Sequence, residues 1–207
     1  MIGCRKLPAR AKARRDAAAI LASAFWDDPV ARYVEPDPAA RPAVVRAFFD
    51  AVIAVAVRSA TIQVTTGPIR GVAVWLPPNE AGATETDLLV SLSAMERRHV
   101  ERFEYAIGAL DAVHESAIRE PHWYLIFLGV APASQGTGIG GALLDPTHAI
   151  ADKRQIPCYL ETFEGPNVQF YRHRGYEAIS VQRVPFSAER VFAMRRLSPS
   201  ERNRLST

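Results

Sequence analysis

The chain has 207 residues, of which 48% are hydrophobic and 23% charged, and its formal net charge is +3 at pH 7. These values are typical of a soluble globular protein, and the length suits one domain over residues 1–207. Since no apolar run reaches the length of about 18 residues that a membrane span requires, and no signal peptide is evident, we expect no membrane partner.

The cysteines and histidines argue against a disulfide-stabilised protein and against a metal-binding protein. Cys4 and Cys158 lie far apart and belong to no paired motif. We therefore expect no disulfide framework, and a reducing cytoplasm suits the chain. The five histidines show no metal-ligand spacing, so the sequence predicts no metal site; they are His99, His114, His122, His148 and His173.

The basic segment 1–15 contains "RKLPARAKARR". A basic tract can bind nucleic acid. This one carries no interleaved aromatic residues and fits no nucleic-acid-binding motif. We therefore predict a solvated end that leads into a helix, and no nucleic-acid partner.

The first part of the chain predicts a strand followed by two helices. The strand covers residues 2–7. The apolar spacing in "DAAAILASAFWDDP" predicts a helix that Asp27, Asp28 and Pro29 end. A second helix is expected over residues 40–59.

A hairpin and a pair of helices follow. "TIQVTTG" and "IRGVAVWLPP" are β-branched runs joined by Gly67-Pro68, which predicts a β-hairpin. Residues 83–119 have a helical apolar pattern with charges on one side, and we expect two helices there. The break between them is predicted near residues 98–101 or at Gly108.

The last part predicts a central unit of strand, loop, helix and strand. "HWYLIFLGV" is a nearly continuous apolar strand, typical of one buried on both faces. A glycine-rich loop opens a helix that runs to about Arg154 and has Pro146 inside it, where we expect a kink. "PCYLET" is the next strand, "NVQFYRHRG" a short helix, and "YEAISVQRV" with "RVFAMRRL" a closing hairpin.

The glycine loop "VAPASQGTGIGGALL", residues 130–144, fits two motifs. Gly136, Gly138 and Gly141 match the dinucleotide fingerprint G-x-G-x-x-G, and Glu161 follows at the distance expected for an acidic ribose ligand. However, "APASQ" separates the strand from the first glycine, whereas the fingerprint places that glycine directly after the strand. Residues 162–207 also hold too few elements to complete a doubly wound sheet.

The same loop, aligned from Gln135 as Gln-x-x-Gly-x-Gly, fits an acyl-coenzyme A pyrophosphate loop. A pyrophosphate needs several backbone N–H groups that converge at a helix N-terminus, and glycines let that backbone approach. Thr137 adds a hydroxyl group. No lysine stands in the P-loop position, which disfavours nucleotide triphosphate hydrolysis.

Together with "YLET" and "NVQFYRHRGYE", the segment "LGVAPASQGTGIGGALL" resembles the GNAT superfamily of N-acetyltransferases. "HWYLIFLGV", the Leu-Leu-x-Pro of Leu143–Pro146 and Asn-x-x-Phe-Tyr are similar to its puromycin N-acetyltransferase-like members. The resemblance covers residues 122–177. It implies an α/β fold with a central mixed, splayed β-sheet flanked by helices, and an acyl-CoA-binding core in that segment.

The resemblance also implies which residues bind acetyl-CoA. The strand backbone would pair with the pantetheine arm, the loop would hold the pyrophosphate, and the short helix would complete the site. An alternative for Asn167 is that it caps this helix. The implied residues are Leu128, Gly129, Val130, Gln135, Gly136, Thr137, Gly138, Gly140, Gly141, Asn167, Phe170 and Tyr171.

Two of the chain's residues are candidates for catalysis. By resemblance, Tyr171 would protonate the thiolate that acyl transfer releases. Glu161 is the first candidate for the general base, because a charged side chain in an apolar strand is costly to bury unless it has a function or a partner. The alternative is that Glu161 forms an ion pair with a nearby arginine. Secondary candidates for the base are His114-Glu115 and His122. The amide of Val130 would meet the oxyanion.

Cys158 and several aromatic residues are weaker candidates for a role in the site. Cys158 is interpreted as a buried hydrophobic residue, because the family transfers the acyl group directly. Aromatic residues could line an acceptor pocket, but the sequence does not distinguish them from core; they are Trp26, Tyr33, Trp75 and Phe103.

The sequence therefore predicts a transferase that moves acetyl from acetyl-CoA directly to a primary amine of a small molecule. The alternatives are acetylation of a protein N-terminus or lysine, a non-catalytic acyl-CoA-binding sensor and, more remotely, an oxidoreductase. We expect a cytoplasmic monomer or homodimer.

Overall fold

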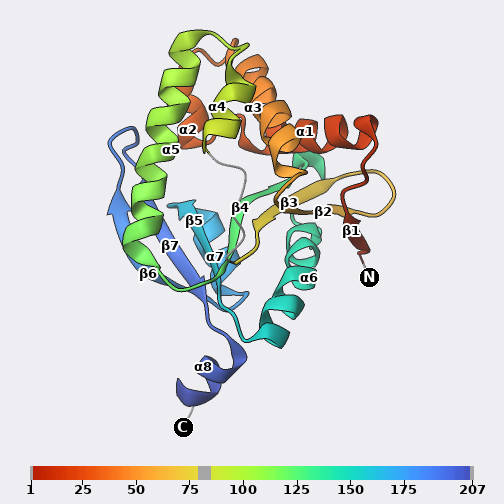
Figure 1. Ribbon diagram of the computed structural model, residues 1–207, viewed down its shortest axis with the longest axis vertical. Helices are drawn as coiled ribbons and strands as arrows, with labels where there is room; N and C mark the ends of the chain where they lie inside the picture. The colour runs from red at the N-terminus through yellow and green to blue at the C-terminus, as the bar shows by residue number, and fades with distance from the viewer. Residues whose placement is uncertain (1, 79–84, 206–207) are drawn as a thin grey trace.

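The computed structural model describes residues 2–78 and 85–205. In these ranges the chain forms a seven-stranded sheet in the order β1-β2-β3-β4-β5-β7-β6, with helices on both faces (Figure 1). The strands are β1 (Cys4–Lys6), β2 (Thr61–Thr65), β3 (Gly71–Leu76), β4 (Trp123–Val130), β5 (Cys158–Phe163), β6 (Tyr176–Arg183) and β7 (Arg190–Arg196). The helices are α1 (Ala11–Phe25), α2 (Pro29–Val34), α3 (Arg41–Ala56), α4 (Glu85–Leu92), α5 (Arg97–Ala117), the short 3-10 helix η1 (Pro132–Ser134), α6 (Ile139–Arg154), α7 (Pro166–Arg172) and α8 (Pro199–Leu205).

The sheet is mixed, as expected. β4 and β5 run parallel, connected through α6, and every other neighbouring pair is antiparallel. A doubly wound dinucleotide fold would need successive parallel strands. The α/β architecture expected from the acyl-CoA motif is confirmed.

The two parallel strands separate soon after they meet. β4 and β5 pair only at Trp123 with Cys158 and at Tyr124 with Tyr159. On its other side, β4 pairs with β3 along its length, with a register shift that leaves Ile126 as the extra residue of a bulge. The sheet is therefore splayed from Tyr124 onward.

The helices bury the two faces of the sheet in separate clusters. α6 and α7 cover the face that carries Trp75, Leu125 and Leu160. α1 and α3 cover the opposite face of β2 and β3, and α5 covers that face of β5 and β7, where Tyr159 is buried. Each strand alternates its side chains between the two clusters. The gap between β4 and β5 therefore opens toward both helical layers.

Two helix boundaries differ from expectation. Asp28 and Pro29 do more than end α1, because they also begin α2: the Asp28 carboxylate accepts a hydrogen bond from the Val30 amide at 2.9 Å, and Pro29 occupies the first helical position. The predicted breaks in the 83–119 segment are wrong. Residues 93–96 separate α4 from α5, and Gly108 lies inside α5. Residues 83 and 84 lie outside the described ranges.

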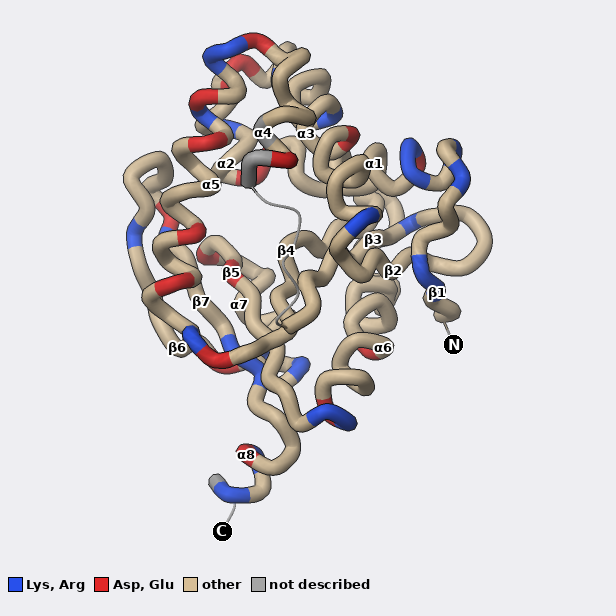
Figure 2. Tube along the Cα trace, in the orientation of Figure 1, with Lys and Arg blue, Asp and Glu red and all other residues tan. Residues whose placement is uncertain are grey.

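Further features of the fold concern the distribution of charge, Pro146, the cysteines and the helix composition. The basic segment is divided between β1 and the first turns of α1, and further charges of both signs are spread over α5, α6 and α8 (Figure 2). Pro146 stands inside α6, and both cysteines are free thiols. Within the described ranges, no helix is both long and apolar enough to cross a membrane.

Candidate active site

The glycine loop leads directly into the N-terminus of α6. Gly138 is the N-cap, with a φ of 87°, and Gly136 has a φ of 73°. Other residue types rarely adopt these left-handed conformations. Among the described residues no side chain caps the helix, so the first amides of α6 remain available to an anion, which the helix dipole also favours.

Two polar side chains of the loop are bonded to the loop itself. The Thr137 hydroxyl donates to the Ser134 carbonyl at 2.7 Å, and the Gln135 amide donates to the Val130 carbonyl at 3.2 Å. These bonds fix the shape of the loop. The Thr137 hydroxyl proton is thus already committed, so the loop itself would donate to a phosphate through its backbone amides.

The glycines within α6 make room for side chains that belong to α7 or follow it. A Cβ atom on Gly140 would lie 3.1 Å from Cζ of Phe170, and one on Gly141 would lie 1.8 Å from Nη2 of Arg174. The Arg174 guanidinium lies 4.3 Å from the centroid of the Phe170 ring. The sequence analysis missed Arg174, although it stands one helical turn after Phe170.

A single cavity of about 1,050 Å³ connects the loop with the splayed strands and with α1, α3 and α5. Most of the predicted site residues line it: Leu128, Val130, Gln135, Gly136, Gly138, Gly140, Glu161, Asn167, Phe170 and Tyr171. Three do not. Thr137 and Gly141 lie outside its wall, and Gly129 packs against α1, where a Cβ atom would lie 2.9 Å from Cδ2 of Leu21.

The register of β4 determines which backbone groups face the gap. Ala131 donates to the carbonyl of Arg70 at 2.9 Å, and Gly129 stands opposite Val72. Because hydrogen-bonding direction alternates along a strand, the backbone groups of Leu128 and Val130 point away from β3 and into the gap. An extended ligand in the gap would meet these two residues.

Glu161 lines the cavity from β5. Its Oε1 atom is buried and makes no hydrogen bond to any residue in the described ranges. Burial raises the pKa of this carboxyl group to about 7; the nearby Asp111 adds to the rise, and the hydroxyl groups of Tyr124 and Tyr159 oppose it. The ion pair considered as an alternative is not among those formed by residues 2–78 and 85–205.

Tyr171 lines the same cavity from α7. Burial raises the pKa of its phenol well above the ordinary value, although Arg174 lowers it, so the hydroxyl group is protonated at neutral pH. Its ring packs against Phe170 and Tyr176, with centroids 5.1 and 5.7 Å away. Tyr171 belongs to the α6–α7 layer, whereas Glu161 points to the α5 layer on the same face as Tyr159. The cavity wall thus includes a carboxyl group and a phenol that belong to opposite faces of the sheet.

The capping interpretation of Asn167 is wrong. α7 begins at Pro166 with Gly165 as N-cap, so Asn167 is the second helical residue. Its side chain is exposed at the cavity wall, in a position to contact a ligand.

The other candidate groups lie outside the cavity wall. Nε2 of His114 lies 2.9 Å from Nε2 of His122, and burial together with His122 lowers the pKa of His114 to about 4. Cys158 is buried, and burial raises the pKa of its thiol to about 12, so it is a poor nucleophile. In the part of the chain that the structure describes, no three metal-ligating side chains cluster together.

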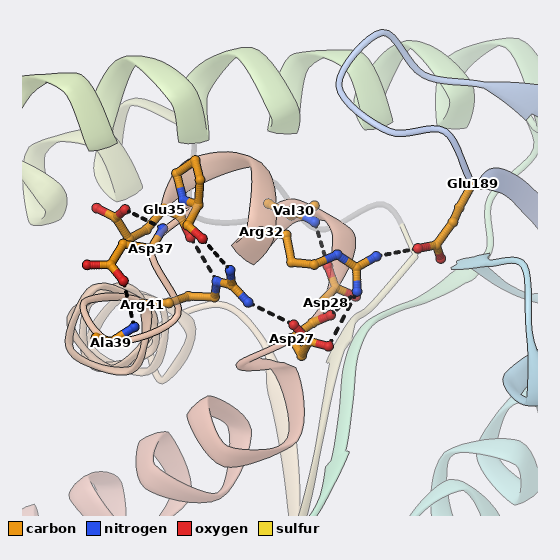
Figure 3. Close-up of polar contacts among 10 residues, drawn as sticks. Asp27, Asp28, Val30, Arg32, Glu35, Asp37, Ala39, Arg41 and Glu189 are labelled. Atoms are coloured by element: carbon orange, nitrogen blue, oxygen red, sulfur yellow. Dashed lines mark hydrogen bonds and ion pairs between the residues drawn. The ribbon is translucent and has the colours of Figure 1, made fainter.

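An ion-pair network borders the cavity where α1 turns into α2 (Figure 3). Arg32 of α2 pairs with Asp27 and with Glu189, which lies in the β6–β7 connection. Arg32, Asp28 and Glu189 all line the cavity, and burial raises the pKa of Asp28 to about 6. The sequence analysis missed this network.

The proposed aromatic lining is partly correct. Trp26 and Phe103 line the cavity, whereas Tyr33 and Trp75 do not. Asp111, Tyr124 and Phe127 line it as well, and the sequence analysis did not single them out. Asp111 does carry a signal, since it is a charge at helical spacing from the apolar Phe103 and Ile107.

Residues 100–178 match the family model described as the acetyltransferase (GNAT) domain. The chain is 27% identical over 180 residues to an uncharacterized N-acetyltransferase of Schizosaccharomyces pombe, a match that spans 80% of this chain and 71% of that protein. A second uncharacterized N-acetyltransferase of that yeast is 44% identical over 54 residues, 26% of this chain and 23% of its own length.

Solved structures agree with these matches. The structure from Corynebacterium glutamicum described as histone acetyltransferase HPA2 and related acetyltransferase is 26% identical and aligns with a TM-score of 0.65, over 95% of this chain and 96% of that one. A structure from Pyrococcus horikoshii, at 14% identity and a TM-score of 0.57 over 96% and 99% of the two chains, shares the fold. The match of residues 100–178 to the acetyltransferase (GNAT) domain model and the shared fold therefore agree with each other.

Proposed function

We propose that this protein transfers the acetyl group of acetyl-CoA to a primary amine of a small molecule. The cavity carries the proposal, because it connects an uncapped helix N-terminus with a carboxyl group whose pKa is about 7 and with a protonated phenol. The similarity of the motifs to puromycin N-acetyltransferase-like proteins also supports a small-molecule acceptor.

The residues fit acetyl-CoA, which supplies the acyl group as a thioester. Gly136, Gly138 and the first amides of α6 would hold the pyrophosphate. Leu128 and Val130 would pair with the pantetheine amides, as an added strand does. Asn167 and Phe170 would contact the pantetheine arm from α7.

Glu161 and Tyr171 then move the protons. A free amine is mostly protonated at neutral pH, and Glu161 accepts the proton that the ammonium must lose. The amine nitrogen forms a bond to the acyl carbon, and the carbon–sulfur bond breaks. The Val130 amide faces the developing oxyanion, and Tyr171 donates its proton to the departing sulfur. The nitrogen loses its second proton as the amide forms, and this proton restores the phenol of Tyr171, so coenzyme A leaves as the free thiol.

A protein acceptor is the second candidate. It is favoured by the description of the Corynebacterium glutamicum structure as a histone acetyltransferase and related acetyltransferase. A peptide acceptor would need polar partners for its backbone along an open cleft. A non-catalytic sensor would bind acetyl-CoA without turnover.

The test is calorimetric titration with acetyl-CoA, NAD and NADP in parallel, followed by thiol release from acetyl-CoA with amine and peptide acceptors. We expect binding of acetyl-CoA alone and faster thiol release with small amines. Binding of NAD or NADP without acetyl-CoA would contradict the proposal. Faster release with a peptide would favour the second candidate, and binding without release would favour the sensor.

A further inference from the structure

The half of the cavity that lies away from the glycine loop has an apolar, aromatic wall. Ile107 and Leu110 of α5 and Phe127 of β4 line it and are partly exposed. The buried rings of Phe48, Phe49 and Phe103 pack behind Ile107 and Phe127. The rings of Phe48 and Phe103 stack at 4.2 Å, and Phe127 of β4 lies 5.1 Å from Phe49. Such a wall offers contact to flat or branched hydrocarbon groups and few partners to hydroxyl groups.

One face of α5 passes from this apolar wall to a carboxylate. Phe103, Ile107, Leu110 and Asp111 all line the cavity and stand at helical spacing. The rise from Phe103 to Asp111 is about 12 Å along the helix axis. Asp111 is close enough to Glu161 for its charge to raise the pKa of that group. The two carboxyl groups therefore lie at one end of the aromatic wall.

The charges around this half favour a cation. Asp28 and Glu189 add carboxyl groups to the wall. Two arginines also line the cavity. Arg32 is paired with Asp27 and Glu189, and the guanidinium of Arg174 lies over Gly141 beside the glycine loop. A carboxyl-rich lining of this kind attracts an ammonium group.

We infer, on the basis of the proposed acetyl transfer, that the acceptor is a small primary amine with a hydrophobic body. Its ammonium lies between Asp111 and Glu161, and its apolar body packs against Ile107, Leu110 and Phe127. A sugar amine would bury hydroxyl groups against this wall without partners, which is costly. The cavity of about 1,050 Å³ must also hold the pantetheine arm, so the acceptor is limited to the size of an arylalkylamine.

The first experiment compares acceptors with the wild-type chain. Thiol release from saturating acetyl-CoA is followed with 2-phenylethylamine and hexylamine, and with ethanolamine, spermidine, glucosamine and a heptapeptide that has a free N-terminus. We expect kcat/KM to be about 10- to 100-fold higher for the two apolar amines, from burial of their hydrocarbon groups. A preference for the polar amines or for the peptide would overturn the inference.

The second experiment fills the apolar half. Ile107→Trp adds bulk at the middle of the α5 face, and we expect it to lower kcat/KM for 2-phenylethylamine about 10-fold or more. Its matched control is Ala112→Trp, which places the same side chain on the exposed face of α5. Equal loss in both variants, or no loss in the first, would count against the inference.

Titration with acetyl-CoA distinguishes failure of the acceptor inference from failure of the proposed acetyl transfer. If wild type binds acetyl-CoA but prefers polar amines, the acceptor class is wrong and the acetyl-transfer proposal stands. If acetyl-CoA binds and none of the amines or the peptide is acetylated, the acceptor inference fails as well. If acetyl-CoA does not bind, both fail. We expect Ile107→Trp to bind acetyl-CoA within about twofold of wild type, because that residue lies away from the glycine loop.

Discussion

The guanidinium group of Arg174 occupies the space next to Gly141 where any other residue would place its Cβ atom. This contact fixes Arg174 against the first turn of α6 and over the Phe170 ring. Nε of Arg174 is buried and has no hydrogen-bond partner within the described part of the chain. The arrangement holds a cation beside the helix N-terminus, where a phosphate would bind.

Gly141→Ala should therefore weaken acetyl-CoA binding without unfolding the protein. The methyl group displaces a guanidinium at the end of a flexible side chain, and the loss of one charge-assisted contact predicts a rise in Kd of about 10-fold. Calorimetric titration measures it, with Arg174→Ala expected to have a similar effect.

The control for this variant is Gly108→Ala in α5, where an added Cβ atom would meet no atom of the described residues within 4 Å. It should leave the Kd unchanged and stabilise the helix by about 0.5–1 kcal/mol. A normal Kd in Gly141→Ala would show that the position of Arg174 is irrelevant to binding.

Glu161→Gln should lower activity and raise stability together. Since general base catalysis contributes about 100-fold or more, kcat/KM for the amine should fall by that factor. Wild-type kcat/KM should rise with pH through about 7, where the carboxyl group ionises, and the variant should lose that limb. Glu101→Gln is the matched control, because Glu101 is exposed on α5, paired with Arg97 and outside the cavity wall.

The stability effect of Glu161 has the opposite dependence on pH. Its pKa is about 7 in the folded chain and 4.5 ordinarily, so the folded state binds more protons between these values. The free energy of unfolding of wild type should therefore fall as pH rises from 4.5 to 7. At pH 8 the glutamine variant should be more stable by up to about 3 kcal/mol, and at pH 4 by much less. Equal effects at both pH values in urea unfolding would contradict this explanation.

Tyr171→Phe should lower kcat and spare the binding of acetyl-CoA. The variant keeps the ring that packs between Phe170 and Tyr176 and removes the proton donor, so we expect kcat to fall about 100-fold. Calorimetry should give an unchanged Kd for acetyl-CoA. Tyr105→Phe, a change on the exposed face of α5, is the control and should have full activity. Unchanged kcat in Tyr171→Phe would remove this residue from the mechanism.

Arg32→Ala should alter the binding of the amine acceptor and leave the binding of acetyl-CoA unchanged. Arg32 and Glu189 connect α2 to the β6–β7 connection at the border of the cavity. Both side chains are about 40% exposed, so the pair contributes at most about 1 kcal/mol to stability. We expect KM for the amine to change several-fold and KM for acetyl-CoA to stay constant. Arg97→Ala removes an exposed ion pair elsewhere, with Glu101 on α5, and should change neither. A change confined to KM for acetyl-CoA would be inconsistent with this placement.

The unit from β4 to β5 could be predicted because its signals are adjacent in the sequence. An apolar run, a glycine loop and a second apolar run define strand, turn and strand without long-range information. Gly108 was misleading, since tertiary packing of α5 offsets the cost of a glycine in a helix interior. For Asn167 the signal was present: proline favours the first helical position, and Pro166 precedes it.

The acceptor side could not be predicted in the same way. Arg32 and Glu189 are 157 positions apart, and nothing local in either segment indicates the partner. Ile107 and Leu110 of α5 have the spacing of ordinary core residues, and the space beside them results from the tertiary arrangement. Asp111 was the exception, because a charge within an apolar helical stripe is visible in the sequence.

The early separation of β4 from β5 divides the sheet into two halves, β1–β4 and β5–β7–β6, connected through two residue pairs. A strand-like ligand in the gap would hydrogen-bond to one half and pack against the other. The bound ligand would therefore connect the two halves of the sheet and stabilise their relative position. By mass action its binding adds to the free energy of unfolding, at 100 times its Kd by about 2.7 kcal/mol. The amides of Leu128 and Val130 should then become sensitive reporters of occupancy in hydrogen exchange, since they point into the gap that the ligand fills.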